Sequence, residues 1–502
     1  MVNNINNLPP VVYAEASVKS VGGHSLFEAP FPINSETVPK FHSEPELVES
    51  AVERLRSEGF EVLHVSPITI TISAPSEVYE RVFKTKIIPV EREVLKFNEM
   101  TTSTFLDTTD TDIPGLIDVS KSSLADVLEG IAIEEPRFRL GVIEPSESLT
   151  TVLTEAERNF FASTKPPAFP PPKSYWHLNV PADVSLGLNA DRVHRDGITG
   201  RDIKVVMIDT GWYAHPFFTQ RGYRSNPVVV GPGSTDPDHD EGSHGTGESA
   251  NIFAVAPDVD FTMVKFNLIT SVGTFNKAVE LNPHIISISW GNSISNVESY
   301  SAADKALAAS IADAVSKGIT VVCSAGNGQW SFPGQHPDVI SAGGAYMHAD
   351  GTFEATPYAS GFSSRIPDFN HRNSPDVCGL VGMPPIGAYI MLPVEPGSKF
   401  DVDLSGNTHP NGDETPNNDG WAAFSGTSAA APQLAGICAL VKQMSPNLSP
   451  TQIREVLKAT ARDVVSGKSN PSTGGNEAVP GVDLATGHGL VDAYEAVKKA
   501  RS

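Results

Sequence analysis

The chain has 502 residues, of which 40% are hydrophobic and 19% are charged, a composition typical of globular rather than disordered proteins. Its net charge is −23, from 36 basic and 59 acidic residues. We therefore expect neither nucleic acid nor an anionic membrane surface as a partner, because both are bound through basic patches.

The N-terminal residues carry no recognisable targeting signal. Residues 1–20 lack a basic segment followed by an apolar run, and the longest apolar piece there is Val11–Ala14. No stretch of about 18 apolar residues occurs anywhere in the chain, so no membrane span is expected. A cytoplasmic location is the resulting expectation, with export by a non-Sec route left open.

The cysteine content is low and does not indicate a disulfide framework. The three residues are Cys323, Cys378 and Cys438, and none of them has the spacing of a metal site. We expect free thiols, buried with the apolar segments that contain them.

In chain order, the first predicted domain is a small α+β unit over residues 44–95, preceded by an N-terminal extension over residues 1–43. Apolar residues recur with helical spacing in two segments and alternate in two others. The predicted elements are a helix from residue 44 to Gly59, a hairpin over 60–73 broken near Pro67, a helix over 76–85 and a strand over 86–94.

Residues 96–173 are predicted to be a linker with one uncertain region. Residues 100–112 are rich in Thr and Asp, which is typical of a solvated connection. A short helix is predicted over 154–163. Five prolines between Lys165 and Lys173 predict a stiff, extended boundary before the next domain. No function is assigned to residues 100–164.

From residue 174 to 502 strands and helices alternate, which predicts an α/β domain with a doubly wound parallel sheet and helices on both faces. Predicted strands are 203–208, 261–265, 285–289 and 319–323; predicted helices are 245–254, 273–281, 300–317, 427–443, 450–460 and 490–500.

Two polar residues in this domain stand where chemistry is expected. Asp209 ends the apolar run that begins at Val205, which places it at the carboxyl edge of the sheet, where α/β sheets bind ligands. His244 lies among small residues in Gly242–Gly247, so another chain segment is able to approach it. Each residue taken alone has an ordinary structural explanation, a turn for the aspartate and a packing role for the histidine.

Two further motifs add a hydroxyl and an amide. Asn327 directly follows the strand over 319–323, where an asparagine makes a turn or points its amide at an oxyanion. Ser428 lies in the segment Gly426–Pro432 at the start of an apolar helix. A serine there either caps the helix or acts as a nucleophile beside the positive end of the helix dipole.

Together, the four segments in the order Asp, His, Asn, Ser resemble the subtilisin-like serine proteases, the subtilases of peptidase family S8. The resemblance covers residues from about 175 to the C-terminus. It implies a serine endopeptidase in which Asp209, His244 and Ser428 form the triad and Asn327 supplies the oxyanion hole. It also implies that Ser289, Trp290 and Gly291, with Ser324, Ala325 and Gly326, bind a protein or peptide substrate as an added strand.

Two features of this resemblance leave alternatives open. Trp290 is bulkier than expected, and it either packs in the core or narrows a substrate subsite. The unit over 44–95 resembles the pro-domains of subtilases and sedolisins, which implies a zymogen inhibited by its own N-terminal domain. An unrelated appended domain is the alternative.

The resemblance requires no cofactor, although many relatives bind Ca²⁺. Two acidic segments have the oxygen ligands that Ca²⁺ prefers, but neither has the spacing of an EF-hand loop, and solvated acidic loops are the alternative. The residues are Asp236, Asp238, Asp240 and Glu241 in the first segment, and Asp401, Asp403, Asp413, Glu414 and Asp419 in the second.

One departure and three rival functions follow. Gly247 stands where the family commonly has a second histidine, a position outside the proton relay. A sedolisin-like acid peptidase would need carboxylates in place of His244 and Asn327, and would work in acid, whereas a histidine base predicts activity rising through roughly pH 6–7. The other rivals are a catalytically silent binding module and a protease dedicated to one protein target.

Overall fold

The computed structural model describes residues 8–96, 99–139, 165–293, 300–384 and 389–501. Within them, no helix is both long enough and apolar enough to cross a membrane.

An eight-stranded sheet forms the centre of the larger domain, in the order β11-β12-β10-β13-β15-β16-β17 with β20 also pairing with β16. All pairings are parallel except that of β17 with β16, so the predicted α/β fold is confirmed. The strands are β10 (Lys204–Asp209), β11 (Val229–Val230), β12 (Asp260–Lys265), β13 (Ile285–Ile288), β15 (Thr320–Ser324), β16 (Ile340–Met347), β17 (Phe353–Ala355) and β20 (Val377–Leu380).

Helices cover both faces of this sheet because its strands are apolar on both sides. Along β10, Val205 and Met207 belong to one apolar core, while Val206 and Ile208 belong to the other. The first core contains α4 (Ala182–Gly187), α5 (Ala190–Arg195), α7 (His244–Val255), α11 (Thr427–Met444), α12 (Pro450–Thr460) and α13 (Ala493–Ala500); the second contains α8 (Ser271–Val279) and α9 (Ala302–Ser316).

Among the helices predicted for this domain, the one over 490–500 is the one whose observed first residue differs from the predicted first residue by more than two positions. It begins at Ala493 because the Asp492 side chain accepts a hydrogen bond from the backbone N–H of Glu495 and caps the helix. The remaining elements of the domain are β9 (Leu178–Asn179), α6 (Pro216–Arg221), β14 (Trp290–Gly291), β18 (Phe362–Ser363), β19 (Asn373–Ser374), β21 (Ile390–Pro393), α10 (Lys399–Asp403) and β22 (Trp421–Phe424).

The N-terminal unit is larger than predicted. Its sheet includes strands that lie before residue 44 and after residue 95, so the predicted boundaries of the unit are wrong. Its sheet has the order β2-β3-β1-β7-β6, with β1 at the centre. The strands are β1 (Val12–Val18), β2 (Glu61–Val65), β3 (Thr69–Ala74), β6 (Leu116–Ile117) and β7 (Leu128–Ile133), and the helices are α1 (Pro45–Ser57) and α2 (Ser76–Phe83). β1 lies before the predicted unit and β7 lies after it. The two strands are far apart in the sequence and pair with each other in the folded chain.

The prediction that the Thr- and Asp-rich residues 100–112 form a solvated linker is also wrong in part. β5 (Glu99–Asp107) pairs with β4 (Ile88–Lys96) in a long antiparallel hairpin. Threonine has a high strand propensity, and the pairing with β4 supplies the partner that the local pattern did not reveal. The helix predicted over 154–163 lies outside the described residues.

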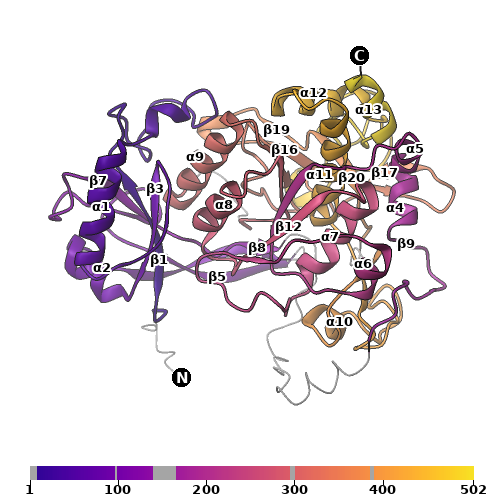
Figure 1. The fold of residues 1–502 in the computed structure, drawn as a ribbon, viewed down its shortest axis with the longest axis horizontal. Coiled ribbons are helices and arrows are strands. Elements are labelled where there is room, and N and C mark those ends of the chain that lie inside the picture. The colour runs from indigo at the N-terminus through magenta and orange to yellow at the C-terminus, as the bar shows by residue number, and fades with distance from the viewer. Residues whose placement is uncertain (1–7, 97–98, 140–164, 294–299, 385–388, 502) are drawn as a thin grey trace.

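The N-terminal unit packs against the α8 and α9 side of the larger domain (Figure 1). Leu26, Phe27 and Leu116 join the apolar core that contains those two helices. His64 on β2 contacts Glu280 just after α8 at 2.9 Å. The two domains therefore share an apolar core as well as polar contacts.

Candidate active site

Parallel pairing brings two strand ends together at the carboxyl edge of the sheet. Ile208 on β10 lies opposite Ile288 on β13, so the next residues, Asp209 at the end of β10 and Ser289 just after β13, lie at the same level. This is the edge at which α/β sheets bind ligands.

His244 is the first residue of α7, and its Nδ1 atom lies 2.7 Å from Oδ1 of Asp209. Both side chains are buried. A carboxylate accepts hydrogen bonds and does not donate them, so Nδ1 carries the proton and the lone pair of Nε2 is available as a base. Gly245 permits this approach, because a Cβ atom there would lie 2.4 Å from the carbonyl oxygen of Gly211.

Ser428 lies in the first turn of α11 and is tied to the same strand end. Its hydroxyl donates to the carbonyl of Ser289 at 3.2 Å, and the Ser289 hydroxyl donates to the carbonyl of Ser428 at 2.9 Å. Nε2 of His244 has no hydrogen-bond partner among the described residues. The Asp–His pair is thus formed, while the serine hydroxyl is turned toward Ser289; such catalytic bonds often tighten only when substrate binds.

Asn327 follows β15 and is oriented by the residue before Ser428. Its Oδ1 atom accepts from the backbone N–H of Thr427 at 2.9 Å and from the Thr427 hydroxyl at 3.0 Å. The Nδ2 atom is buried and has no partner within the described residues. A side-chain amide that is held through its oxygen and keeps an unused N–H donor is suited to bind an oxyanion.

A model of the subtilase family matches residues 200–489 of this chain. The chain belongs to the subtilase family. M-protease from Shouchella clausii (strain KSM-K16) is 27% identical to it over 297 residues, which cover 56% of this chain and 65% of that protein. Subtilisin Savinase from Lederbergia lenta is 26% identical over 302 residues, which cover 57% of this chain and 93% of that protein.

A solved structure of fervidolysin from Fervidobacterium pennivorans, described as a keratinolytic enzyme related to subtilisin, has a similar fold. The TM-score is 0.55 at 18% identity, and the match covers 97% of this chain and 61% of that one. The chain therefore spans slightly less than two thirds of the length of fervidolysin and of M-protease.

In the first predicted substrate-binding segment of this subtilase, Ser289–Gly291, the last two residues form β14 and are already paired with another strand. β8 (Phe138–Arg139) runs antiparallel to β14, with Arg139 opposite Trp290 and Phe138 opposite Gly291. The Trp290 indole packs on Phe266 and donates to the carbonyl of Ile208 at 2.9 Å. Its side chain therefore lies in the core, and only its backbone faces the paired strand.

The second predicted segment, Ser324–Gly326, lies buried at the end of β15. The Ser324 hydroxyl donates to the carbonyl of Ile288 at 3.2 Å, and the N–H of Gly326 donates to the Thr427 hydroxyl at 3.1 Å. Gly326 has φ +117°, and a Cβ atom there would lie 2.6 Å from the carbonyl of Gln329. These contacts set the position of Asn327, the next residue.

The side chains of His244 and Ser428 have no accessible surface, and the ring of His244 packs beside Phe400 and Phe424. At the tip of the β4–β5 hairpin, the backbone N–H of Leu95 donates to the carbonyl of Ser293 at 3.0 Å, and the Leu95 carbonyl accepts from Gln329 Nε2 at 3.1 Å. At Gly247, a Cβ atom would lie 2.3 Å from the Phe424 ring, which leaves no room for a second histidine.

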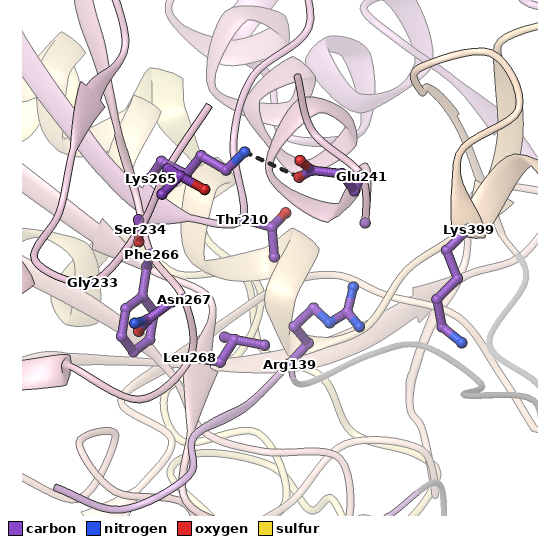
Figure 2. Close-up of a pocket in the computed structure, with 12 residues that line it drawn as sticks. Arg139, Thr210, Gly233, Ser234, Glu241, Lys265, Phe266, Asn267, Leu268 and Lys399 are labelled. Atoms are coloured by element: carbon purple, nitrogen blue, oxygen red, sulfur yellow. Dashed lines mark hydrogen bonds and ion pairs between the residues drawn. The ribbon is translucent and has the colours of Figure 1, made fainter. Parts of the chain in front are cut away.

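A pocket of about 390 Å³ lies beside β8 at the same edge (Figure 2). Arg139 and Leu268 line it together with Thr210, the residue after Asp209. Lys265 forms an ion pair with Glu241 at 3.0 Å on its far wall. The chain segment that pairs with β14 is thus bordered by space large enough for a side chain.

Within the two acidic segments, all of whose residues are described, no group of three or more His, Cys, Asp or Glu side chains is placed to hold an ion. Asp240 instead accepts from the Thr210 hydroxyl at 2.7 Å and from the backbone N–H and hydroxyl of Thr246. Asp413 accepts from Thr415 and from the N–H of Ala423. The three cysteines are free and buried, as the sequence suggested.

Glu248, which belongs to none of the four sequence motifs, is buried one helical turn after His244. Its Oε1 atom lies 3.8 Å from Nε2 of His244, and its other oxygen accepts from Asn251 at 3.0 Å. Burial, and then the charge of Asp209, raise the pKa of Glu248 well above its ordinary value. The signal in the sequence was an acidic residue four positions after the histidine on a helix of small and apolar residues.

We expect Glu248→Gln to stabilise the folded chain at pH 8 more than at pH 5. A carboxyl whose pKa is raised by folding contributes stability below its unfolded pKa and loses it as pH rises toward the folded pKa, because the unfolded chain ionises first. Because glutamine does not ionise, it avoids this loss, and its advantage in Tm over wild type should grow as the pH rises from 5 to 8.

The measurement is the Tm at both pH values, in a Ser428→Ala background that avoids self-digestion. Glu49→Gln, on the exposed face of α1, is the matched control and should not shift Tm at either pH. A lower Tm for Glu248→Gln at pH 8 would instead indicate that the ionised carboxylate is stabilised by the imidazolium.

Proposed function

We propose that the chain is a serine endopeptidase that hydrolyses peptide bonds with Asp209, His244 and Ser428. The observation that carries this proposal is the 2.7 Å bond between Asp209 and His244, with the Ser428 hydroxyl held at the adjacent strand end. Rotation of that hydroxyl toward Nε2 would give the imidazole the serine proton as oxygen attacks the carbonyl. The imidazolium then donates this proton to the leaving amine, and Asp209 stabilises its charge.

Asn327 and the backbone N–H of Ser428 would stabilise the tetrahedral oxyanion. The unused Nδ2 donor supports this role, because Thr427 already holds the other end of the amide. A preorganised donor of this kind acts without reorganisation as charge develops. A sedolisin would need carboxylates at positions 244 and 327, and this chain has a histidine and an asparagine there.

The substrate would bind as an extended strand along β14. The backbone pairing of β8 with Trp290 and Gly291 supports this mode, since main-chain groups recognise any extended peptide. The same pairing supports synthesis as a zymogen: residues before 140 occupy the strand position that a substrate needs, and the two catalytic side chains have no accessible surface. No cofactor takes part in this chemistry.

Labelling with a fluorophosphonate probe tests the proposal. The probe reacts with an activated serine, so we expect it to label the processed enzyme and not the full-length chain. Ser428→Ala should not be labelled in either form. Ser316→Ala, whose hydroxyl only caps the end of α9 by donating to Asp313, should be labelled like wild type. No labelling of any form of the wild-type chain would favour a silent binding module.

A further inference from the structure

An arginine side chain of the N-terminal segment is buried in a pocket of the catalytic domain. Arg137 precedes β8, and its backbone N–H donates to the carbonyl of Leu268 at 2.7 Å. Its side chain has no exposed surface, and Nη1 lies 2.5 Å from Oδ1 of Asp304, itself 2% exposed. Nε of Arg137 donates to the Ser271 hydroxyl at 3.3 Å.

Three separate segments of the catalytic domain form this pocket. Asp304 lies in the first turn of α9, Ser271 begins α8, and Asn292 follows β14. The Asn292 amide donates to the second carboxylate oxygen of Asp304 at 3.0 Å, while its own carbonyl accepts from the N–H of Phe332. The carboxylate is therefore fixed in orientation, with one oxygen directed at the guanidinium.

Arg137 occupies the place of a particular residue of a bound strand. Arg139 lies opposite Trp290 and Phe138 opposite Gly291, and the strand runs toward Ser289, to which Ser428 is bonded. In a substrate with the same register, the residue opposite Ser289 carries the carbonyl that is attacked. The residue in the place of Arg137 is then the fourth before the scissile bond, the P4 residue.

We infer that Asp304 is a specificity-determining residue that selects arginine at the P4 position of substrates. Once the N-terminal unit leaves, Arg137 leaves the pocket together with Glu134 and Glu135, and Asp304 is then the one remaining carboxylate among the described residues that act on this guanidinium. An apolar P4 side chain would bury this carboxylate without a partner, which is costly, whereas a guanidinium restores the pair. The inference depends on the proposed protease function.

The test compares peptides cleaved by the processed wild-type enzyme. The parent is a quenched fluorescent peptide with the sequence of residues 136–145, and in its variants citrulline, the neutral isostere of arginine, replaces the residue of position 137 or of position 139. We expect citrulline at position 137 to lower kcat/KM by about 100-fold, the loss typical when a buried charge pair loses one partner. Citrulline at position 139 is the matched comparison, because it removes the same charge from a residue that packs on Phe400.

The variant Asp304→Asn should cleave the arginine and citrulline peptides of position 137 at similar rates. Asp313→Asn, on the same helix and paired with His42 and Lys317, should keep the wild-type preference. Equal cleavage of both peptides by wild type would overturn the inference and leave the protease function intact. A preference that survives Asp304→Asn would also overturn it. Absence of cleavage of every peptide by wild type, as by Ser428→Ala, would instead contradict the protease function.

Discussion

Replacing Ser428 by alanine is expected to lower peptide hydrolysis by roughly 10⁶-fold, the loss seen when a triad of this kind loses its nucleophile. Without the hydroxyl no acyl-enzyme forms, and only residual binding and oxyanion stabilisation remain. If the N-terminal unit is released by self-cleavage, the variant should stay at full length while wild type is shortened. Gel migration over time, followed by N-terminal sequencing of the shortened chain, measures both the rate and the cleavage site.

The Ser316→Ala chain is again the control and should be shortened like wild type. Mixing the Ser428→Ala variant with a trace of processed wild type separates cleavage within one chain from cleavage between chains. Shortening of the purified alanine variant at the wild-type rate would contradict the role assigned to Ser428. A wild-type chain that never shortens would contradict only the self-processing part of the proposal.

Replacing Asp209 by asparagine is expected to slow self-cleavage by roughly 10⁴-fold while the fold is kept. Asparagine has nearly the same shape, but its amide is able to donate to Nδ1 of His244, to which Asp209 now bonds at 2.7 Å. The proton then sits on Nε2, and the imidazole has no lone pair with which to take the serine proton. The imidazolium also loses a buried carboxylate as its counter-charge.

The first-order rate of self-cleavage of the purified chain is the measurement, with fluorophosphonate labelling as a second readout. Asp191→Asn is the control, since Asp191 forms only a surface pair with Arg195 within α5 and should leave the rate unchanged. Such surface pairs contribute little. A rate for Asp209→Asn within about tenfold of wild type would show that His244 is oriented by another group.

The elements around the site were predictable because their signals are local. The mainly apolar runs 205–208 and 285–288 reflect strands that are buried on both faces, and each run ends where the polar residue begins. α7 and α11 begin at or next to the residues that carry the chemistry, so the positions of His244 and Ser428 followed from helix signals.

The extent of the N-terminal unit was not predictable from local signals. β1 pairs with β3 and with β7, and these partners lie far along the chain. The run Val12–Val18 becomes a central strand of its sheet only because β3 pairs with one of its edges and β7 pairs with the other. Periodicity reports the type of an element and not its neighbours.

The sequence by itself determined the kind of chemistry, since the aspartate, histidine, asparagine and serine motifs each carry their own structural context. Only the tertiary structure decided which side chains share a pocket. Arg137 and Asp304 are 167 positions apart, Glu248 faces His244 through the geometry of α7, and Trp290 turns into the core. These contacts depend on how sheet edge, helices and N-terminal unit pack together, which no short segment of the chain encodes.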